Sequence, residues 1–259
     1  MDPARAAALH VALGLEGDAP RAGDALPPFF HQVYFWQVLP PADLGRDGHA
    51  AAGKVLPDLG LPRRMWAGGR LWFRAALTLG APARKTTTIE KVEHKTGRTG
   101  PLAFLTLRHD FEQGGDVVIT EHQDLVFRQD PDPNAPPATP APAPTPAPQN
   151  AAFRQTAHFD TTLLFRYSAL TMNGHRIHYD EAYATQVEGY SGLVVHGPLL
   201  AQRLMLLAHA RLGALSRFEF RATSAVSHGE SVEFCADGDK FWAAGQDGRL
   251  CMTAQASAG

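Results

Sequence analysis

The sequence is poor in the residues on which several classes of protein depend. Its 259 residues include two cysteines, Cys235 and Cys251, and no Cys-x-x-Cys pair. A disulfide framework or a cysteine metal site is therefore disfavoured, and we expect two buried, free thiols. The 24 basic residues are balanced by 26 acidic ones, with no basic run. Such a balance builds no positive field, so neither nucleic acid nor a membrane surface is an expected partner.

Long apolar runs are also lacking. No segment approaches the roughly twenty apolar residues needed to span a bilayer. The first residues, MDPARAAALHVALGLEGD, contain no basic leader and no long apolar stretch, so a secretory signal is not expected. Asp2 and Pro3 instead suit the start of a short helix, and Gly14 suits its end. We expect a cytoplasmic protein.

Proline, by contrast, is concentrated in one place. Residues 131–148 read PDPNAPPATPAPAPTPAP. Proline lacks an amide donor and fixes φ, so this stretch is predicted to be an extended spacer that joins neither a sheet nor a helix. It divides the chain into a domain of residues 1–130, a linker of residues 131–150 and a domain of residues 151–259.

The first domain is predicted to be rich in strands. Its β-branched or alternating segments are separated by Gly, Pro or Asp, and they cover residues 71–80, 86–96, 100–113 and 116–128. The segment LPDLGLPRRMWAGGRLWF, residues 56–73, contains glycines and prolines that interrupt a helix. We interpret it as the degenerate counterpart of a helix in the second domain.

The second domain is predicted to hold that long helix. The expected order is a strand over residues 151–170, a short helix over 180–187 and a long helix over 198–212. Further strands follow at residues 217–225, 230–238, 240–246 and 249–256. A long helix followed by an antiparallel meander predicts an α+β fold in which a sheet wraps around one helix.

Polar residues that can do chemistry crowd into two short phrases, YSALTMNGHRIHYD at residues 167–180 and VVHGP at residues 194–198. Together they resemble the signature of the MaoC-like, type-2 enoyl-thioester hydratase and dehydratase family. The branch they are most similar to contains hydroxyacyl-thioester dehydratases and mesaconyl- and itaconyl-CoA hydratases. RRMWAGGRLWF resembles the amino-terminal domain of these proteins more weakly. The resemblance implies a double hotdog of two antiparallel sheets, each wrapping a helix, with the first helix degenerate and the site mainly in the second domain.

The signature departs from the family pattern at its acid/base pair. The family has an aspartate and, five residues later, a histidine that together hold the reacting water; here these places carry Asn173 and His178. An amide can orient water but cannot exchange a proton at neutral pH. His175 stands where the family has asparagine. We therefore assign His178 as the principal acid/base group, with His175 and Asn173 positioning or sharing the proton.

The second phrase supplies the remaining catalytic requirement. Gly197 and Pro198 open the long helix, and the resemblance implies that the Gly197 amide is the donor to the thioester oxyanion. His196 and Tyr167 are candidates for substrate contact, although a packed loop histidine is the favoured interpretation of His196. Asp180 either caps the short helix or orients a histidine.

Arginines are candidates for binding a second carboxylate on the acyl group. Arg166 and Arg176 flank the signature, and Arg64 lies near MWAGG together with Arg63 and Arg70. A guanidinium can bind a carboxylate through two parallel hydrogen bonds. Arg176, Arg166 and Arg64 are taken as substrate-binding candidates; the alternative is that each is solvated or contacts phosphate.

These observations predict reversible hydration of a 2-enoyl-CoA and dehydration of its 3-hydroxyacyl-CoA partner. Resemblance alone suggests a C5 dicarboxylic chain of the mesaconyl-C4-CoA or itaconyl-CoA type. A 3-hydroxyacyl carrier-protein dehydratase, a hotdog acyl-CoA thioesterase and a non-enzymatic binding module stay open. No cofactor is expected beyond the CoA of the substrate, and no metal, the alternative being a site of His175, His178 and Asp180. A homo-oligomer also stays open.

Overall fold

The computed structural model describes residues 1–97, 100–130 and 143–259. Its strands form a nine-stranded antiparallel sheet in the order β2-β3-β4-β1-β6-β9-β8-β7-β5. The strands are β1 (Arg63–Phe73), β2 (Arg84–Gly97), β3 (Gly100–Gln113), β4 (Asp116–Arg128), β5 (Phe153–His158), β6 (Leu215–Ala222), β7 (Ser231–Asp237), β8 (Lys240–Gly245) and β9 (Leu250–Ala258).

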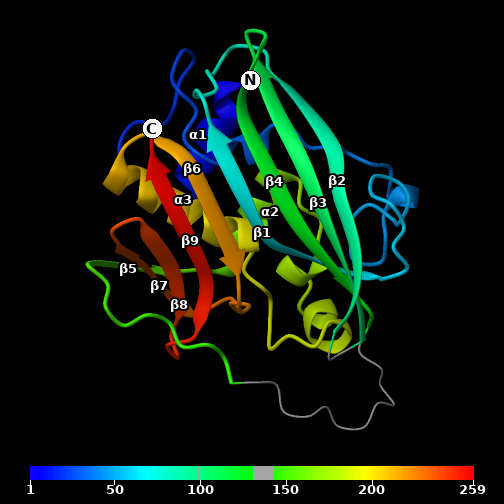
Figure 1. The fold of residues 1–259 in the computed structure, drawn as a ribbon. Helices are drawn as coiled ribbons and strands as arrows, with labels where there is room; N and C mark the ends of the chain where they lie inside the picture. The colour runs from blue at the N-terminus through cyan, green and yellow to red at the C-terminus, as the bar shows by residue number, and fades with distance from the viewer. Residues whose placement is uncertain (98–99, 131–142) are drawn as a thin grey trace.

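The helices lie together on one side of this curved sheet (Figure 1). They are α1 (Pro3–Ala12), η1 (Phe30–Val33), η2 (Pro41–Asp43), α2 (Thr161–Thr171), η3 (Arg176–His178), η4 (Tyr183–Val187) and α3 (Gly197–Leu212). The predicted start of α1 is confirmed, because the Asp2 carboxylate accepts the Ala4 amide at 2.9 Å. In the described part of the chain, no helix is both long enough and apolar enough to cross a membrane.

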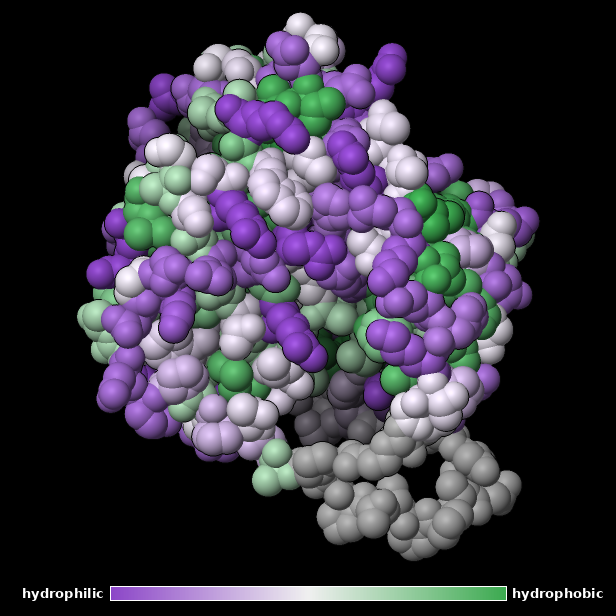
Figure 2. Space-filling view, in the orientation of Figure 1, coloured by the Kyte–Doolittle hydropathy of each residue, from purple (hydrophilic) through white to green (hydrophobic). Residues whose placement is uncertain are grey.

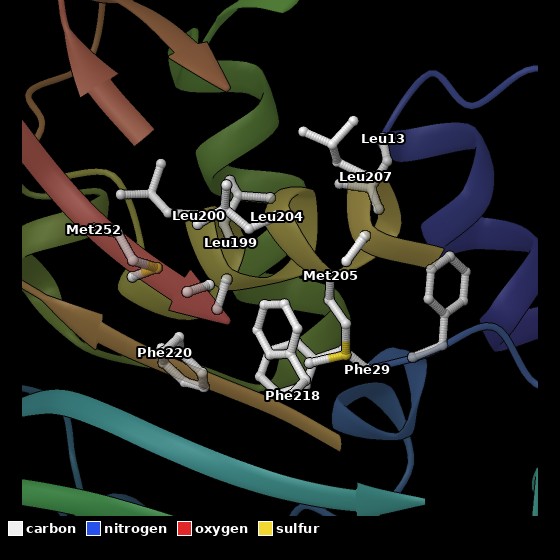
Figure 3. Packing of buried hydrophobic residues seen from close by; sticks show 14 of the residues in the cluster. Leu13, Phe29, Leu199, Leu200, Leu204, Met205, Leu207, Phe218, Phe220 and Met252 are labelled. Carbon is white, nitrogen blue, oxygen red and sulfur yellow. The ribbon is translucent and has the colours of Figure 1, made fainter. Parts of the chain in front are cut away.

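The second half has the expected sheet wrapped around a helix. α3 contacts β6, β7, β8 and β9. Its side chains, among them Leu200, Leu204 and Met205, gather in one apolar cluster with residues of β6 and β9 (Figure 3). This packing fixes the position of the α3 amino terminus relative to the sheet. Outside this core, the face seen in Figure 2 is largely hydrophilic.

The first half differs from expectation at residues 56–73. This segment, interpreted as a degenerate helix, contains strand β1, which pairs with β4 on one side and β6 on the other. Its glycines explain the strand, because a Cβ on Gly68 would lie 2.6 Å from the carbonyl oxygen of Phe220. Glycine thus permits close pairing here. The pairing of β1 with β6 joins the two expected sheets into one.

A second difference lies at residues 151–170, predicted to be one strand. The strand β5 ends at His158, and α2 begins at Thr161. Asp160 is the reason, because its carboxylate accepts the Leu163 amide at 2.7 Å and so caps the helix. Leu164 and Tyr167 then bury one face of α2.

Part of the proline-rich segment, residues 131–142, lies outside the described residues. The end of the segment belongs to no named strand, but Pro146 forms an isolated bridge with Arg249. Ala147 packs in a small apolar cluster that includes Cys235. Both cysteines are free and buried, as expected. The domain limits themselves stay a prediction.

Candidate active site

The first signature phrase forms the loop that follows α2. The helix ends when Met172 takes a left-handed conformation with φ of 52°, and the Asn173 side-chain oxygen then accepts the His175 amide at 3.1 Å. This bond turns the chain into η3, which carries His178. Asn173 therefore shapes the loop as well as lining the cavity.

His178 is held in one orientation and one tautomer. Its Nδ1 lies 2.7 Å from the carbonyl oxygen of Val194. A carbonyl only accepts, so Nδ1 carries the proton and Nε2 of the neutral ring has a free lone pair. Burial lowers the pKa of His178 to about 3, against the Val194 hydrogen bond, which opposes the shift. At neutral pH His178 is therefore a neutral hydrogen-bond acceptor.

The His178 ring stacks on that of His196, with centroids 3.6 Å apart and planes at 20°. His196 is 0% exposed and lies 2.8 Å from the Ser168 hydroxyl through Nε2. It does not line the cavity. This geometry gives no support to substrate contact by His196: it packs behind His178, and burial lowers its pKa.

His175 connects this pair to the first half of the chain. Its ring centroid lies 5.5 Å from that of His178 and 4.4 Å from that of His49. Burial, followed by the effect of His49, lowers the pKa of His175 to about 2. Three imidazoles, His49, His175 and His178, thus line one side of the cavity.

His49 was not found from the sequence, nor was the carboxylate beside it. Asp47 lies 2.9 Å from His49 Nδ1, and the Asp47 carbonyl accepts the Arg176 amide at 2.9 Å. The two residues sit in a loop between η2 and β1 without a periodic pattern. The phrase DGH had no motif to mark it, and its partner is about 130 residues away.

The residue predicted to donate to the oxyanion lies at the start of α3. Gly197 is the first residue of α3, lines the cavity, and is followed by Pro198, which has no amide proton. Among the described residues, no backbone acceptor pairs with the Gly197 amide. That amide is available at the positive end of a long helix.

The cavity has a volume of about 1030 Å³. It lies against the first-half sheet, where the described residues contain no long helix equivalent to α3. The sheet residues that line it include Arg64 and Trp66 of β1, Leu107 and His109 of β3, and Leu125 of β4. Without such a helix in the described first half, there is room for a ligand beside the histidines.

Tyr167 lines the same cavity and is 1% exposed. Its ring meets His196 edge-on. Its hydroxyl has no hydrogen-bond partner among the described residues, and burial raises its pKa. A buried hydroxyl without a partner is a good position for a ligand contact.

The arginine candidates separate clearly. Arg64 lines the cavity. Arg176 does not: its guanidinium donates to Asp180 at 2.7 Å and to the Arg46 carbonyl at 3.0 Å. Arg166 is exposed on α2, outside the cavity lining. This geometry gives no support to acyl binding by Arg176 or Arg166.

Asp180 serves as a cap, one of its two expected roles. Its carboxylate accepts the Tyr183 amide at 3.0 Å and pairs with Arg176. It is thus unavailable to the alternative metal site with His175 and His178. The potential ligand atoms of Asp47, His49 and His175 lie within 4.8 Å of one another. However, Asp47 and His49 already share a hydrogen bond.

Neutral imidazoles, a free helix amide and an acyl-sized cavity are what addition of water to an activated double bond requires. The fold and the site thus define a hotdog-type hydratase or dehydratase. Residues 29–228 match the model of the family "hydroxyacyl-thioester dehydratase type 2". The chain belongs to this family.

Known proteins agree with this assignment. The chain is 40% identical to mesaconyl-C(4)-CoA hydratase of Chloroflexus aurantiacus over 261 residues, 99% of this chain and 92% of the relative. HtdX of Mycobacterium tuberculosis superposes with a TM-score of 0.69 at 17% identity, over 100% of this chain and 96% of that one. A second protein of that organism, described as a double hotdog, gives 0.57 at 14% identity, over 99% and 91%. The predicted family and double hotdog are confirmed, and the chain is a hydro-lyase.

Proposed function

We propose that this enzyme reversibly hydrates a 2-enoyl-CoA whose acyl chain carries a second carboxylate, of the mesaconyl-C4-CoA or itaconyl-CoA type. Arg64 carries the proposal. It lines the cavity and has no side-chain hydrogen bond or ion pair among the described residues. The named activity of the Chloroflexus relative supports the same substrate class.

Arg64 also lies close to the reacting centre. Its charge is near enough to lower the pKa of His175 and of His49, although burial is the larger cause for both. Burial lowers the pKa of Arg64 itself, while Asp47 opposes this. A carboxylate on a short acyl chain would satisfy a half-buried guanidinium that lacks an acceptor among the described residues.

The geometry supports one course for the hydration. The water donates one O–H to the Nε2 lone pair of His178 while its oxygen bonds to C3. The proton that it loses passes to an imidazole of the cluster and then to C2, so that H and OH are added overall. The Gly197 amide stabilises the enolate charge on the thioester oxygen. Dehydration is the reverse of these steps.

Enoyl-CoA thioesters with and without a terminal carboxylate test the proposal. We expect the conjugated absorbance to fall with both, and faster with the carboxylated substrate. Arg64→Met should lower kcat/KM about 10- to 100-fold for that substrate only, because a hydrogen bond to a charged group contributes about 1.5–3 kcal/mol. Arg166→Met, an exposed arginine outside the cavity, is the matched control. Equal losses on both substrates would refute the role of Arg64.

The same assay separates the proposed CoA hydratase from a carrier-protein dehydratase and from an acyl-CoA thioesterase. Turnover of carrier-protein thioesters in place of CoA thioesters would indicate a carrier-protein dehydratase. Release of free thiol from saturated acyl-CoA would indicate a thioesterase. His178→Ala should abolish hydration while the fold is retained; unchanged turnover would remove His178 from the mechanism.

The proposal includes the setting in which the enzyme works. We propose a cytoplasmic enzyme, alone or as a homo-oligomer, that needs no cofactor beyond the CoA of its substrate. Light scattering would give the oligomeric state. Full activity after dialysis against a chelator is expected, and a lost activity restored by a metal would contradict it.

A further inference from the structure

We propose that His49, from the first half of the chain, is the residue that carries the proton during hydration, and that Asp47 is its positioning residue. The inference rests on the proposed hydration. It supplies the acid/base group that the amide of Asn173 cannot provide, and it divides the work between two histidines. His178 holds the water, and His49 takes and returns the proton.

The Asp47 carboxylate holds His49 through two hydrogen bonds, one to the ring and one to the backbone. One carboxylate oxygen lies 2.9 Å from Nδ1, and the other accepts the His49 amide at 3.1 Å. Both side chains are mostly buried, at 13% and 20% exposed. A carboxylate accepts hydrogen bonds, so Nδ1 carries the proton and Nε2 is left as the basic atom.

The loop holds this pair beside the other histidines. His49 lines the cavity, 4.4 Å from His175 between ring centroids. The backbone is anchored at both sides, because the Arg176 amide donates to Asp47 and the Gly45 amide donates to the His49 carbonyl at 2.7 Å. The contact therefore belongs to a well-fixed loop that joins the two halves at the site.

His49 differs from His175 and His178 in having a hydrogen-bonded anionic partner. His178 donates to a neutral carbonyl, and the ring of His175 has no hydrogen-bond partner among the described residues. An imidazolium on His178 would have no anionic partner. One on His175 would be stabilised by Asp47 without a hydrogen bond, which makes both poorer proton acceptors than His49. A proton on His49 is stabilised by the Asp47 carboxylate.

The surrounding charges agree with this division. Burial would raise the pKa of Asp47, but the His49 hydrogen bond and the other local partners bring it to about 2, so the carboxylate is ionised. Burial lowers the pKa of His49, with Asp47 opposing and Arg64 adding to the shift. Among the described residues, the titratable and charged groups that act on His49 or are acted on by it are Asp47, Arg64, His175 and His178. At neutral pH the resting pair is a carboxylate with a neutral imidazole.

In this mechanism His49 takes up one proton and returns it, while Asp47 stays ionised. As the water oxygen bonds to C3, one O–H bond breaks and its proton moves to Nε2 of His49. The electron pair of the C2–C3 double bond moves onto the thioester enolate. C2 then takes the proton from His49, which returns to its neutral form with no other reactant consumed.

A metal ion held by Asp47, His49 and His175 is the competing interpretation, since their ligand atoms lie within 4.8 Å. The hydrogen bond between Asp47 and Nδ1 of His49 removes that nitrogen as a ligand, which leaves Nε2 as the ring atom of His49 that could bind an ion. The two interpretations predict different responses to chelators, so the experiment separates them.

The test compares His49→Gln and Asp47→Asn in the full chain with Asp43→Asn as control, a neighbouring aspartate in a partly exposed pair with Lys54. His49→Gln should lower kcat at least 100-fold with KM changed less than threefold, in the usual range for a general acid or base. Asp47→Asn should lower kcat about tenfold or more and move the acidic limb of the pH–rate profile to lower pH. A structural role would not move that limb.

Added imidazole should partly restore His49→Ala, since the cavity can admit it. A kcat for His49→Gln within threefold of the parent would overturn the inference while hydration stands. Loss of activity with chelator and its return with a divalent metal would also overturn it, in favour of a metal. A parent enzyme inactive on every enoyl thioester would remove both the function and the inference.

Discussion

Gly48 and Gly174 pass each other so closely that neither position has space for a side chain. A Cβ on Gly174 would lie 2.7 Å from the Gly48 carbonyl oxygen, and a Cβ on Gly48 would collide with the Gly174 carbonyl. The first glycine sits between Asp47 and His49, and the second between Asn173 and His175. This backbone crossing brings the two loops together at the site.

Gly48→Ala should therefore separate the loops. The added methyl cannot be accommodated without moving backbone, so we expect a large fall in kcat and a lower melting temperature. Gly53→Ala is a matched control. Both glycines have positive φ, 86° and 78°, but a Cβ at Gly53 would meet nothing within 4 Å. Equal effects of the two substitutions would show that only backbone strain matters.

Gly197→Ala should act on activity without acting on the fold. Its φ is not in the left-handed region, and the nearest atom to an added Cβ is the Trp66 carbonyl oxygen at 3.8 Å. The methyl would instead stand beside the amide to which the thioester must come close. We expect a fall in kcat/KM of about 100-fold, comparable to the loss of an oxyanion donor. Thermal unfolding should change little, and a matching loss of stability would contradict this account.

The sequence predicted those elements and site residues that depend on contacts between residues close together in the chain. The capped helix α1, the apolar helix α3 and the alternating strands of the second half follow from periodicity and turn residues. The histidines of the signature and Gly197 were found because they fall within a few residues of one another. Arg64 was identified only as one of several arginines.

What was missed depends on contacts between distant segments. β1 is a strand because Gly68 lets it pair closely with β6, although its glycines suggested an interrupted helix. Asp47 and His49 become part of the site through the crossing at Gly174 and the hydrogen bond from the Arg176 amide to the Asp47 carbonyl. Nothing in their own neighbourhood marks them, so no reading of local patterns could have placed them.

Acid should destabilise the protein through its buried neutral histidines. His175 and His178 have pKa values of about 2 and 3 when folded, against about 6.5 for an unfolded histidine. The unfolded state therefore binds more protons below pH 6.5, and stability falls as pH drops through this window.

The variant His175→Asn tests the predicted loss of stability at low pH. Removing one such histidine should flatten the dependence of the unfolding free energy on pH between pH 6 and 4, by about 1.4 kcal/mol per pH unit. Urea unfolding at several pH values would measure the slope. His94→Asn, on the exposed strand β2, should leave it unchanged. A slope for His175→Asn equal to that of the parent would mean that His175 is protonated in the fold.

A buried ion pair links the first half to the loop after η4. Arg63 of β1 donates to the Glu188 carboxylate and, at 2.8 Å, to the Glu188 carbonyl. Both side chains are only 6% exposed. The Tyr183 hydroxyl donates to the same carboxylate at 3.3 Å.

Glu188→Gln would keep the shape of this side chain but leave the Arg63 charge buried without a counterion. We expect a loss of about 3–5 kcal/mol in the unfolding free energy, the usual effect of removing one partner from a buried pair. Glu93→Gln is the control, because Glu93 pairs with Lys91 and Lys95 on the surface and solvent screens such pairs. Urea titrations of both variants give the comparison. The pair also anchors β1, which carries Arg64, so Glu188→Gln should weaken binding of a carboxylated substrate as well. If the unfolding free energy of Glu188→Gln equals that of the parent, water must reach Arg63.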